Sequence, residues 1–173
     1  KRDFKGKGPR YVILTDITYM FYGNCKKCYV SVMKDAYTNE ILAYAISTSM
    51  EEDFVLNTVN MCMKLHKHEI PQNALVHSDQ GIHYKAYSFK ALLHNCELRQ
   101  SMSRKANCWD NAPQESFFGY MKDEIDISMC KEFDEVKVRR RAHRKELDPE
   151  QQKKRNRMIT LAMVLIGLVL NGI

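Results

Sequence analysis

Three short apolar runs near the N-terminus, separated by turn signals, constrain the fold of this chain more than any other feature. The runs cover residues 11–15, 28–33 and 41–46. The pair Gly23-Asn24 and the polar stretch 35–40 separate them, and such short connections favour antiparallel neighbours. The sequence therefore predicts a three-stranded antiparallel meander at the start of the fold.

The following residues alternate between helical and strand patterns. Residues 50–67 repeat apolar side chains at helical spacing, and Ser49 and Glu52 have the form of a capping box at the start of this helix. We interpret the Met and Cys side chains of the helix as core. Further strands are predicted at 74–77 and 98–102, with further helices over 84–94 and from an N-cap at Asn111, with Pro113 in its first turn.

This order of elements predicts an α/β domain with a five-stranded mixed sheet flanked by helices. Asp16 ends the first apolar run and Asp79 follows the fourth, so both are expected at strand ends, where α/β sheets place ligands. Glu115 belongs to the first turns of the last helix. Gly119 and Lys122 follow Glu115 on the same helix face, where a glycine admits a close backbone and a lysine can bind phosphate.

Asp16, Asp79 and Glu115 are the candidate catalytic and metal-binding residues. Three carboxylates on separate elements are the ligand set that a two-metal phosphoryl-transfer site needs. Mg²⁺ and Mn²⁺ take oxygen ligands, and two such ions about 4 Å apart can act on both the attacking and the leaving oxygen of a phosphodiester. A single aspartate at a strand end is more often a turn or capping residue, so the assignment depends on all three settings together.

Three motifs carry a resemblance to a known family. They are LTDIT around Asp16, HSDQGIHY from His77 to Tyr84, and QSMSRKANCWDNAPQESFFGYMK from Gln100 to Lys122. In these residues the chain resembles the catalytic domains of insertion-sequence transposases in the retroviral integrase superfamily. The resemblance covers residues 1–137 and implies an RNase H-like fold.

The resemblance also implies a function. The family's D-D-E triad carries over to Asp16, Asp79 and Glu115, which would bind two Mg²⁺ or Mn²⁺ ions. The implied reaction is hydrolysis of a phosphodiester at an element's end, followed by attack of the freed 3′-hydroxyl on target DNA. The implied partners are DNA, a separate helix-turn-helix DNA-binding region, and further copies of the chain assembled on DNA. Lys122 matches the family's basic residue after the glutamate.

Other polar residues near the triad have two interpretations each. His77 precedes Asp79 by two residues and so shares its face of a strand, where it could orient the site or simply be a buried structural histidine. Arg104, Lys105 and Asn107 belong to a polar loop that could contact DNA or could be a plain surface loop. The further acids, Asp35, Asp110, Asp123 and Glu124, are interpreted as structural or solvated.

Residues 138–173 depart from the family pattern. Residues 137–157 hold ten Lys/Arg against three Asp/Glu, so this stretch accounts for the net charge of +6. It could bind DNA phosphates or form a solvated helix face. The apolar run 158–170 is shorter than the ~20 residues that a membrane span needs, and no membrane association is expected. A frameshift or fusion near Lys137 is our explanation of the departure.

Composition places the protein in a broad class. Hydrophobic residues make up 45% and charged residues 28%, as in soluble globular proteins. Six cysteines without a secretion signal favour a reducing cytosol, and a DNA substrate favours the bacterial nucleoid. The single C-x₂-C pair, Cys25 and Cys28, is insufficient for a zinc site. The alternatives to a transposase are an inactive remnant that binds DNA or a partner transposase, and a ribonuclease of the same fold.

Overall fold

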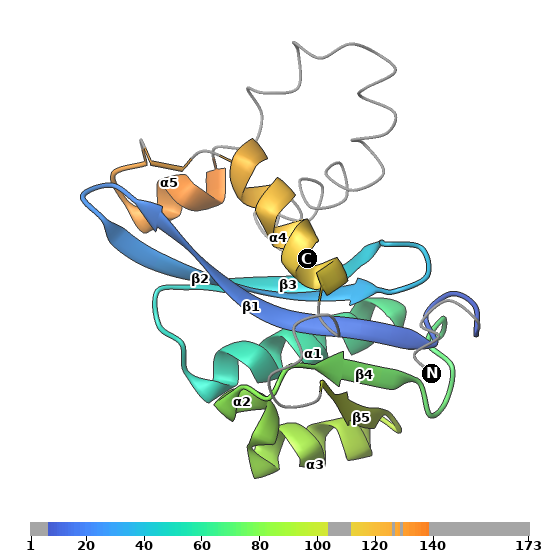
Figure 1. Cartoon of the computed structure of the whole chain (residues 1–173). Helices are drawn as coiled ribbons and strands as arrows, with labels where there is room; N and C mark the ends of the chain where they lie inside the picture. The colour runs from blue at the N-terminus through green and yellow to red at the C-terminus, as the bar shows by residue number, and fades with distance from the viewer. Residues whose placement is uncertain (1–6, 104–111, 126, 129, 139–173) are drawn as a thin grey trace, which may run out of the picture.

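The computed structural model describes residues 7–103, 112–125, 127–128 and 130–138, and a five-stranded mixed sheet lies at its centre (Figure 1). Its strand order is β3-β2-β1-β4-β5. β1 to β3 pair antiparallel, and β4 and β5 run parallel to β1. The predicted meander and mixed sheet are confirmed. The strands are β1 (Val12–Tyr22), β2 (Lys26–Asp35), β3 (Ile41–Ser47), β4 (Leu75–Ser78) and β5 (Arg99–Met102).

β1 extends well beyond the apolar run that predicted it. It continues to Tyr22 because β2 stays paired with it along its whole length. Asp16 therefore lies inside β1, opposite Val32, and the prediction that it ends a strand is wrong. β4 pairs with β1 over Val12–Leu14, so Asp16 lies two residues beyond the paired region. That position keeps one side of the strand open near Asp16.

The helices cover the two faces of the sheet. α1 (Glu52–His66), α2 (Ile82–Lys85) and α3 (Tyr87–Asn95) lie on one face, and α4 (Ala112–Glu124) lies on the other (Figure 1). α5 (Phe133–Val138) lies beside the turn between β1 and β2. None of the helices in the described residues is long and apolar enough to cross a membrane.

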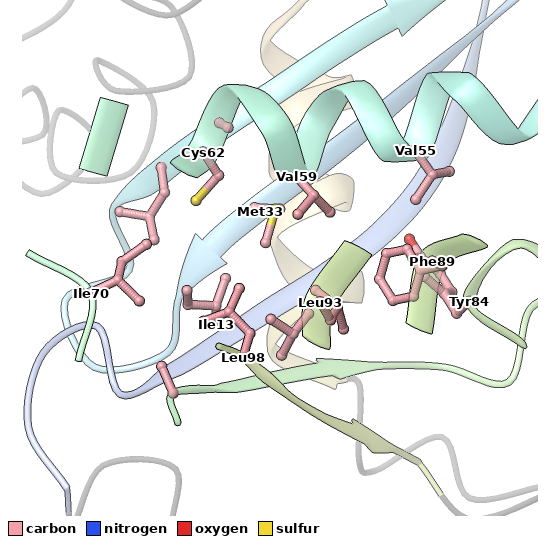
Figure 2. Packing of buried hydrophobic residues seen from close by; sticks show 14 of the residues in the cluster. Ile13, Met33, Val55, Val59, Cys62, Ile70, Tyr84, Phe89, Leu93 and Leu98 are labelled. Atoms are coloured by element: carbon pink, nitrogen blue, oxygen red, sulfur yellow. The ribbon is translucent and has the colours of Figure 1, made fainter. Parts of the chain in front are cut away.

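The larger hydrophobic core lies between the sheet and α1 to α3. Figure 2 shows Ile13 and Met33 of the sheet facing Val55 and Val59 of α1. α2 and α3 close this layer, with the rings of Tyr84 and Phe89 packed edge to face at 5.2 Å between centroids. The core interpretation of the apolar face of α1 is thus confirmed.

A second core holds α4 against the opposite face of the sheet. Its buried residues are Val30, Val32, Ile41, Tyr44, Phe117, Phe118 and Met121. The Lys34 ammonium lies 5.4 Å from the Phe117 ring centroid, and Lys34 pairs with Leu14 on β1. Nearer the C-terminal end of α4, the Lys122 ammonium lies 5.0 Å from the ring centroid of Tyr19 on β1. α4 therefore runs along the sheet in the direction of β1.

Two predicted helix boundaries are wrong. α1 has Glu51 as its N-cap without a side-chain cap bond, and the Ser49 N–H instead donates to Ser47 Oγ at 3.1 Å. Ser49 is thus hydrogen-bonded to the last residue of β3, and the predicted capping box does not form. The predicted helix over 84–94 is divided into α2 and α3, because Ala86 adopts an extended ψ of 145°.

Candidate active site

Asp16 presents its carboxylate toward the α4 side of the sheet. Along β1 the even-numbered residues Val12, Leu14 and Met20 belong to the clusters on that side, whereas Ile13 belongs to the core under α1. Because side chains alternate along a strand, Asp16 shares the face of Leu14. Its carboxylate is half-buried and accepts the Ile17 N–H at 2.8 Å.

Asp79 directly follows β4 and is held by a local turn. Its Oδ1 accepts the Gly81 N–H at 2.8 Å, and the Ser78 hydroxyl donates to its backbone carbonyl at 2.9 Å. His77 pairs with Leu14 across β4 and β1, so these two side chains share a face. Asp79 follows His77 by two residues, so strand alternation continued one residue past β4 gives it the same face as Asp16.

The buried phenol of Tyr84 feels the charges of both aspartates. Its side chain is buried, and burial followed by the negative charge of Asp16 holds the pKa of its phenol well above the ordinary value. Asp79 raises the same pKa further. Both carboxylates therefore act on one buried hydroxyl from neighbouring strands. Although Tyr84 ends the second motif, nothing in its sequence pattern distinguished it from an ordinary core tyrosine.

Glu115 lies in the first turn of α4 and is exposed. Within the part of the chain that the structure describes, no three His, Cys, Asp or Glu side chains are close enough together to hold a metal ion. Asp16 and Asp79 thus share a face of the sheet, and the described residues form no three-ligand cluster that includes Glu115. The preceding residue, Gln114, is fully buried, and its amide has no hydrogen-bond partner among the described residues.

The other predicted site residues occupy distinct positions. His77 is buried, and its Nδ1 lies 3.0 Å from the Ser101 hydroxyl on β5. Lys122 is exposed on α4, with its ammonium 5.0 Å from the ring centroid of Tyr19. Arg104, Lys105 and Asn107 lie outside the described residues.

Lys34 and Asp35 form a pair of buried charged residues that sequence reasoning did not single out together. Burial lowers the pKa of Lys34 to about 8. Asp35 is fully buried and caps the turn between β2 and β3, because its carboxylate accepts the Tyr37 N–H at 3.0 Å and the Thr38 hydroxyl at 2.7 Å. These bonds are consistent with the interpretation of Asp35 as a structural residue.

The sequence matches a known protein family and known relatives. Residues 6–108 match the family described as Integrase core domain. InsK, a protein of insertion sequence element IS150 from Escherichia coli (strain K12), is 39% identical over 125 residues, which are 72% of this chain and 43% of InsK. The chain thus spans less than half the length of this relative.

Two solved structures share the fold. The Mos1 transposase catalytic domain, solved with Raltegravir and Mg, matches with a TM-score of 0.57 at 14% identity, over 74% of this chain and 67% of that one. The HTLV-2 integrase catalytic core domain, in complex with magnesium and in dimeric form, matches with a TM-score of 0.51 at 13% identity, over 69% and 77%. The expected RNase H-like fold is confirmed. The chain belongs to the integrase core domain family.

Proposed function

We propose that this chain is the catalytic domain of a DDE transposase that cleaves DNA and joins a freed 3′-hydroxyl to target DNA. The observation that carries the proposal is the common face of the sheet that β1–β4 pairing gives to Asp16 and Asp79, and the charges of both raise the pKa of the buried Tyr84 phenol. α4 packs on this face of the sheet and carries Glu115 and Lys122, which are both exposed. InsK, as a protein of an insertion sequence element, supports the assignment to transposition.

The donor groups suit Mg²⁺ or Mn²⁺. Asp16 and Asp79 supply carboxylate oxygens, which hard divalent cations prefer, and Glu115 is the candidate third ligand. Two bound cations would activate the attacking hydroxyl and stabilise the leaving oxygen of the phosphodiester. The magnesium in the Mos1 and HTLV-2 structures supports this choice of ion.

The chain's own residues orient the site. The Gly81 N–H fixes one oxygen of Asp79, and the Ile17 N–H fixes one oxygen of Asp16, so each carboxylate has a defined direction. His77 lies behind Asp79 on β4 and is itself positioned by Ser101. Lys122, one helical stretch after Glu115, provides a cation for a DNA phosphate.

The substrates and partners follow from this reaction. They are the DNA ends of a mobile element and target DNA, with end recognition by a separate helix-turn-helix region. Joining two ends requires at least two copies of the domain on DNA, and the dimeric form of the HTLV-2 core is consistent with such an assembly. A DNA substrate would place the protein at the bacterial nucleoid. Arg104, Lys105 and Asn107 remain candidate DNA contacts.

Mn²⁺-dependent nicking of supercoiled plasmid tests the proposal. The wild-type chain should nick the plasmid only with the metal, and Glu115→Gln should reduce the rate by at least about a hundredfold, because the amide removes a negatively charged ligand. Asp123→Asn is the matched control, since Asp123 is an exposed acid of the same helix. It should retain wild-type nicking.

The outcomes separate the alternatives. Equal nicking by wild type and Glu115→Gln would contradict the assigned site. If folded wild-type chain does not nick, addition of the helix-turn-helix region in trans distinguishes an inactive remnant from a domain that needs this region. Preferential cleavage of an RNA–DNA hybrid would favour the ribonuclease alternative.

A further inference from the structure

Two exposed aromatic rings lie next to each other on the outer half of β1. Tyr19 is 48% exposed and Phe21 is 51% exposed, and their ring centroids are 5.5 Å apart in an edge-to-face arrangement. Single exposed apolar side chains are ordinary on protein surfaces. An adjacent pair on a strand that extends beyond its β4 neighbour presents a continuous aromatic surface instead.

Two lysines approach these rings. The Lys27 ammonium lies 4.9 Å from the Tyr19 centroid and 5.6 Å from that of Phe21, and the Lys122 ammonium lies 5.0 Å from Tyr19. Neither lysine forms an ion pair with a carboxylate of the described residues. Lys26 differs, because its ammonium forms a salt bridge with Glu132, with 3.2 Å between Nζ and Oε1. We call Tyr19, Phe21, Lys27 and Lys122 the hairpin surface.

The hairpin surface adjoins the proposed active site along two elements. Tyr19 follows Asp16 by three residues on β1, about 10 Å along the strand, and its side chain alternates to the opposite face of β1. The Lys122 ammonium of α4 nevertheless lies 5.0 Å from the Tyr19 ring centroid. Lys122 follows Glu115 by seven residues on α4, which is also about 10 Å along a helix. This distance equals about three nucleotides at 3.4 Å each. Among the described residues, none of β4 pairs with β1 beyond Leu14, so a DNA strand with one phosphate at the carboxylates can pass over this unpaired edge of β1 to the rings.

We propose that the hairpin surface binds unpaired nucleotides of the DNA strand that enters the active site. This inference rests on the proposed function and names the form of DNA that the site takes. Bases stack on aromatic rings only when their faces are free, as in single-stranded or locally opened DNA. The lysines would leave the rings and bind the backbone phosphates. Duplex DNA hides its base faces, so it would use the lysines but not the rings.

Fluorescence anisotropy with the full chain and no divalent metal tests the proposal. The probes are a labelled single-stranded oligonucleotide and the duplex of the same sequence. Tyr19→Leu should weaken single-strand binding about tenfold, because it removes a stacking ring, and should change duplex binding little. Tyr19→Phe keeps the ring and should retain affinity, while circular dichroism checks that both variants fold.

A salt titration tests the lysine part with a matched pair of variants. Lys27→Ala should reduce the slope of log affinity against log salt by about 0.7 for the single strand. Lys26→Ala removes the same charge from a neighbouring exposed residue that Glu132 already neutralises, so it should leave the slope nearly unchanged. Equal slopes for the two variants would overturn this role of Lys27.

Two results would overturn the proposal as a whole. One is wild-type affinity of Tyr19→Leu for the single strand, and the other is equal weakening for single strand and duplex. Glu115→Gln keeps this test independent of the proposed function, since it should bind the single strand as wild type does. A variant that loses nicking but keeps single-strand binding tests the proposed active site. A variant that loses single-strand binding but keeps duplex binding tests the hairpin surface.

Discussion

Gly81 determines how closely the chain can pass the carboxylate of Asp79. A Cβ at this position would lie 3.0 Å from Asp79 Oδ1 and 3.4 Å from the Tyr84 ring. The backbone of Gly81 has a φ of −55°, which any residue can adopt. The requirement for glycine is therefore one of space beside the proposed metal ligand rather than of backbone conformation.

Gly81→Ala should impair activity more than folding. The added methyl group pushes the Asp79 carboxylate from its place, and small displacements of reacting groups can cost about a hundredfold in rate. We expect Mn²⁺-dependent plasmid nicking to fall by about tenfold or more. The free energy of unfolding, measured with urea, should change by about 1 kcal/mol or less. Nicking at the wild-type rate would mean that Asp79 can shift without loss of function.

Among elements, α4 has one side buried against the sheet and one side exposed. Phe117 and Phe118 are buried against the sheet, while Gly119 is exposed, and a Cβ there would meet nothing within 4 Å among the described residues. The close backbone approach expected at Gly119 is therefore not made by the described part of the chain. An interior helical glycine without a packing reason weakens its helix.

Gly119→Ala should stabilise the protein. Alanine restricts the unfolded chain and favours the helix by about 1 kcal/mol relative to glycine. Urea denaturation should show this increase in the free energy of unfolding. A decrease would mean that a segment outside the described residues packs on Gly119. A stabilised variant with weaker DNA binding would indicate that DNA uses the open space.

At the scale of the whole molecule, Lys34 places a charge inside the domain. Only 1% of the residue is exposed, and burial lowers its pKa from 10.5 to about 8. Between about pH 8 and 10.5 the unfolded chain binds more protons at this residue than the folded chain does. The contribution of Lys34 to the free energy of unfolding therefore rises with pH across this window, by roughly 3 kcal/mol at most.

Lys34→Met isolates this effect. The variant removes the buried charge, so its advantage over wild type should be largest near pH 7 and should shrink as pH rises toward 10.5. The variant must be compared with wild type because buried thiols make the free energy of unfolding change with pH in the opposite direction. Burial raises the pKa of Cys62 to about 12, so its stabilising contribution is lost as pH rises above about 9. Urea denaturation from pH 7 to 10.5 measures the difference, and a pH-independent difference would contradict the titration of Lys34.

The sequence alone determined the meander, the mixed sheet and the three candidate carboxylates. Turn signals and alternating apolar residues depend only on residues that are neighbours in the sequence. They predicted most strands to within a few residues of their observed ends. Three local predictions were wrong. The capping box of Ser49 and Glu52 does not form, the helix predicted over 84–94 is divided at Ala86, and Asp16 lies within β1 because β2 extends the pairing.

Only the tertiary structure decided which side chains meet. Leu14 and His77 are far apart in sequence, and their pairing across β1 and β4 gives Asp16 and Asp79 a common face. Tyr84 of α2 lies in the core under α1, where the charges of both aspartates raise its pKa. Tyr19 and Lys122 likewise come together only because α4 lies along β1. Such contacts depend on strand register and helix packing, which no local pattern of residues specifies.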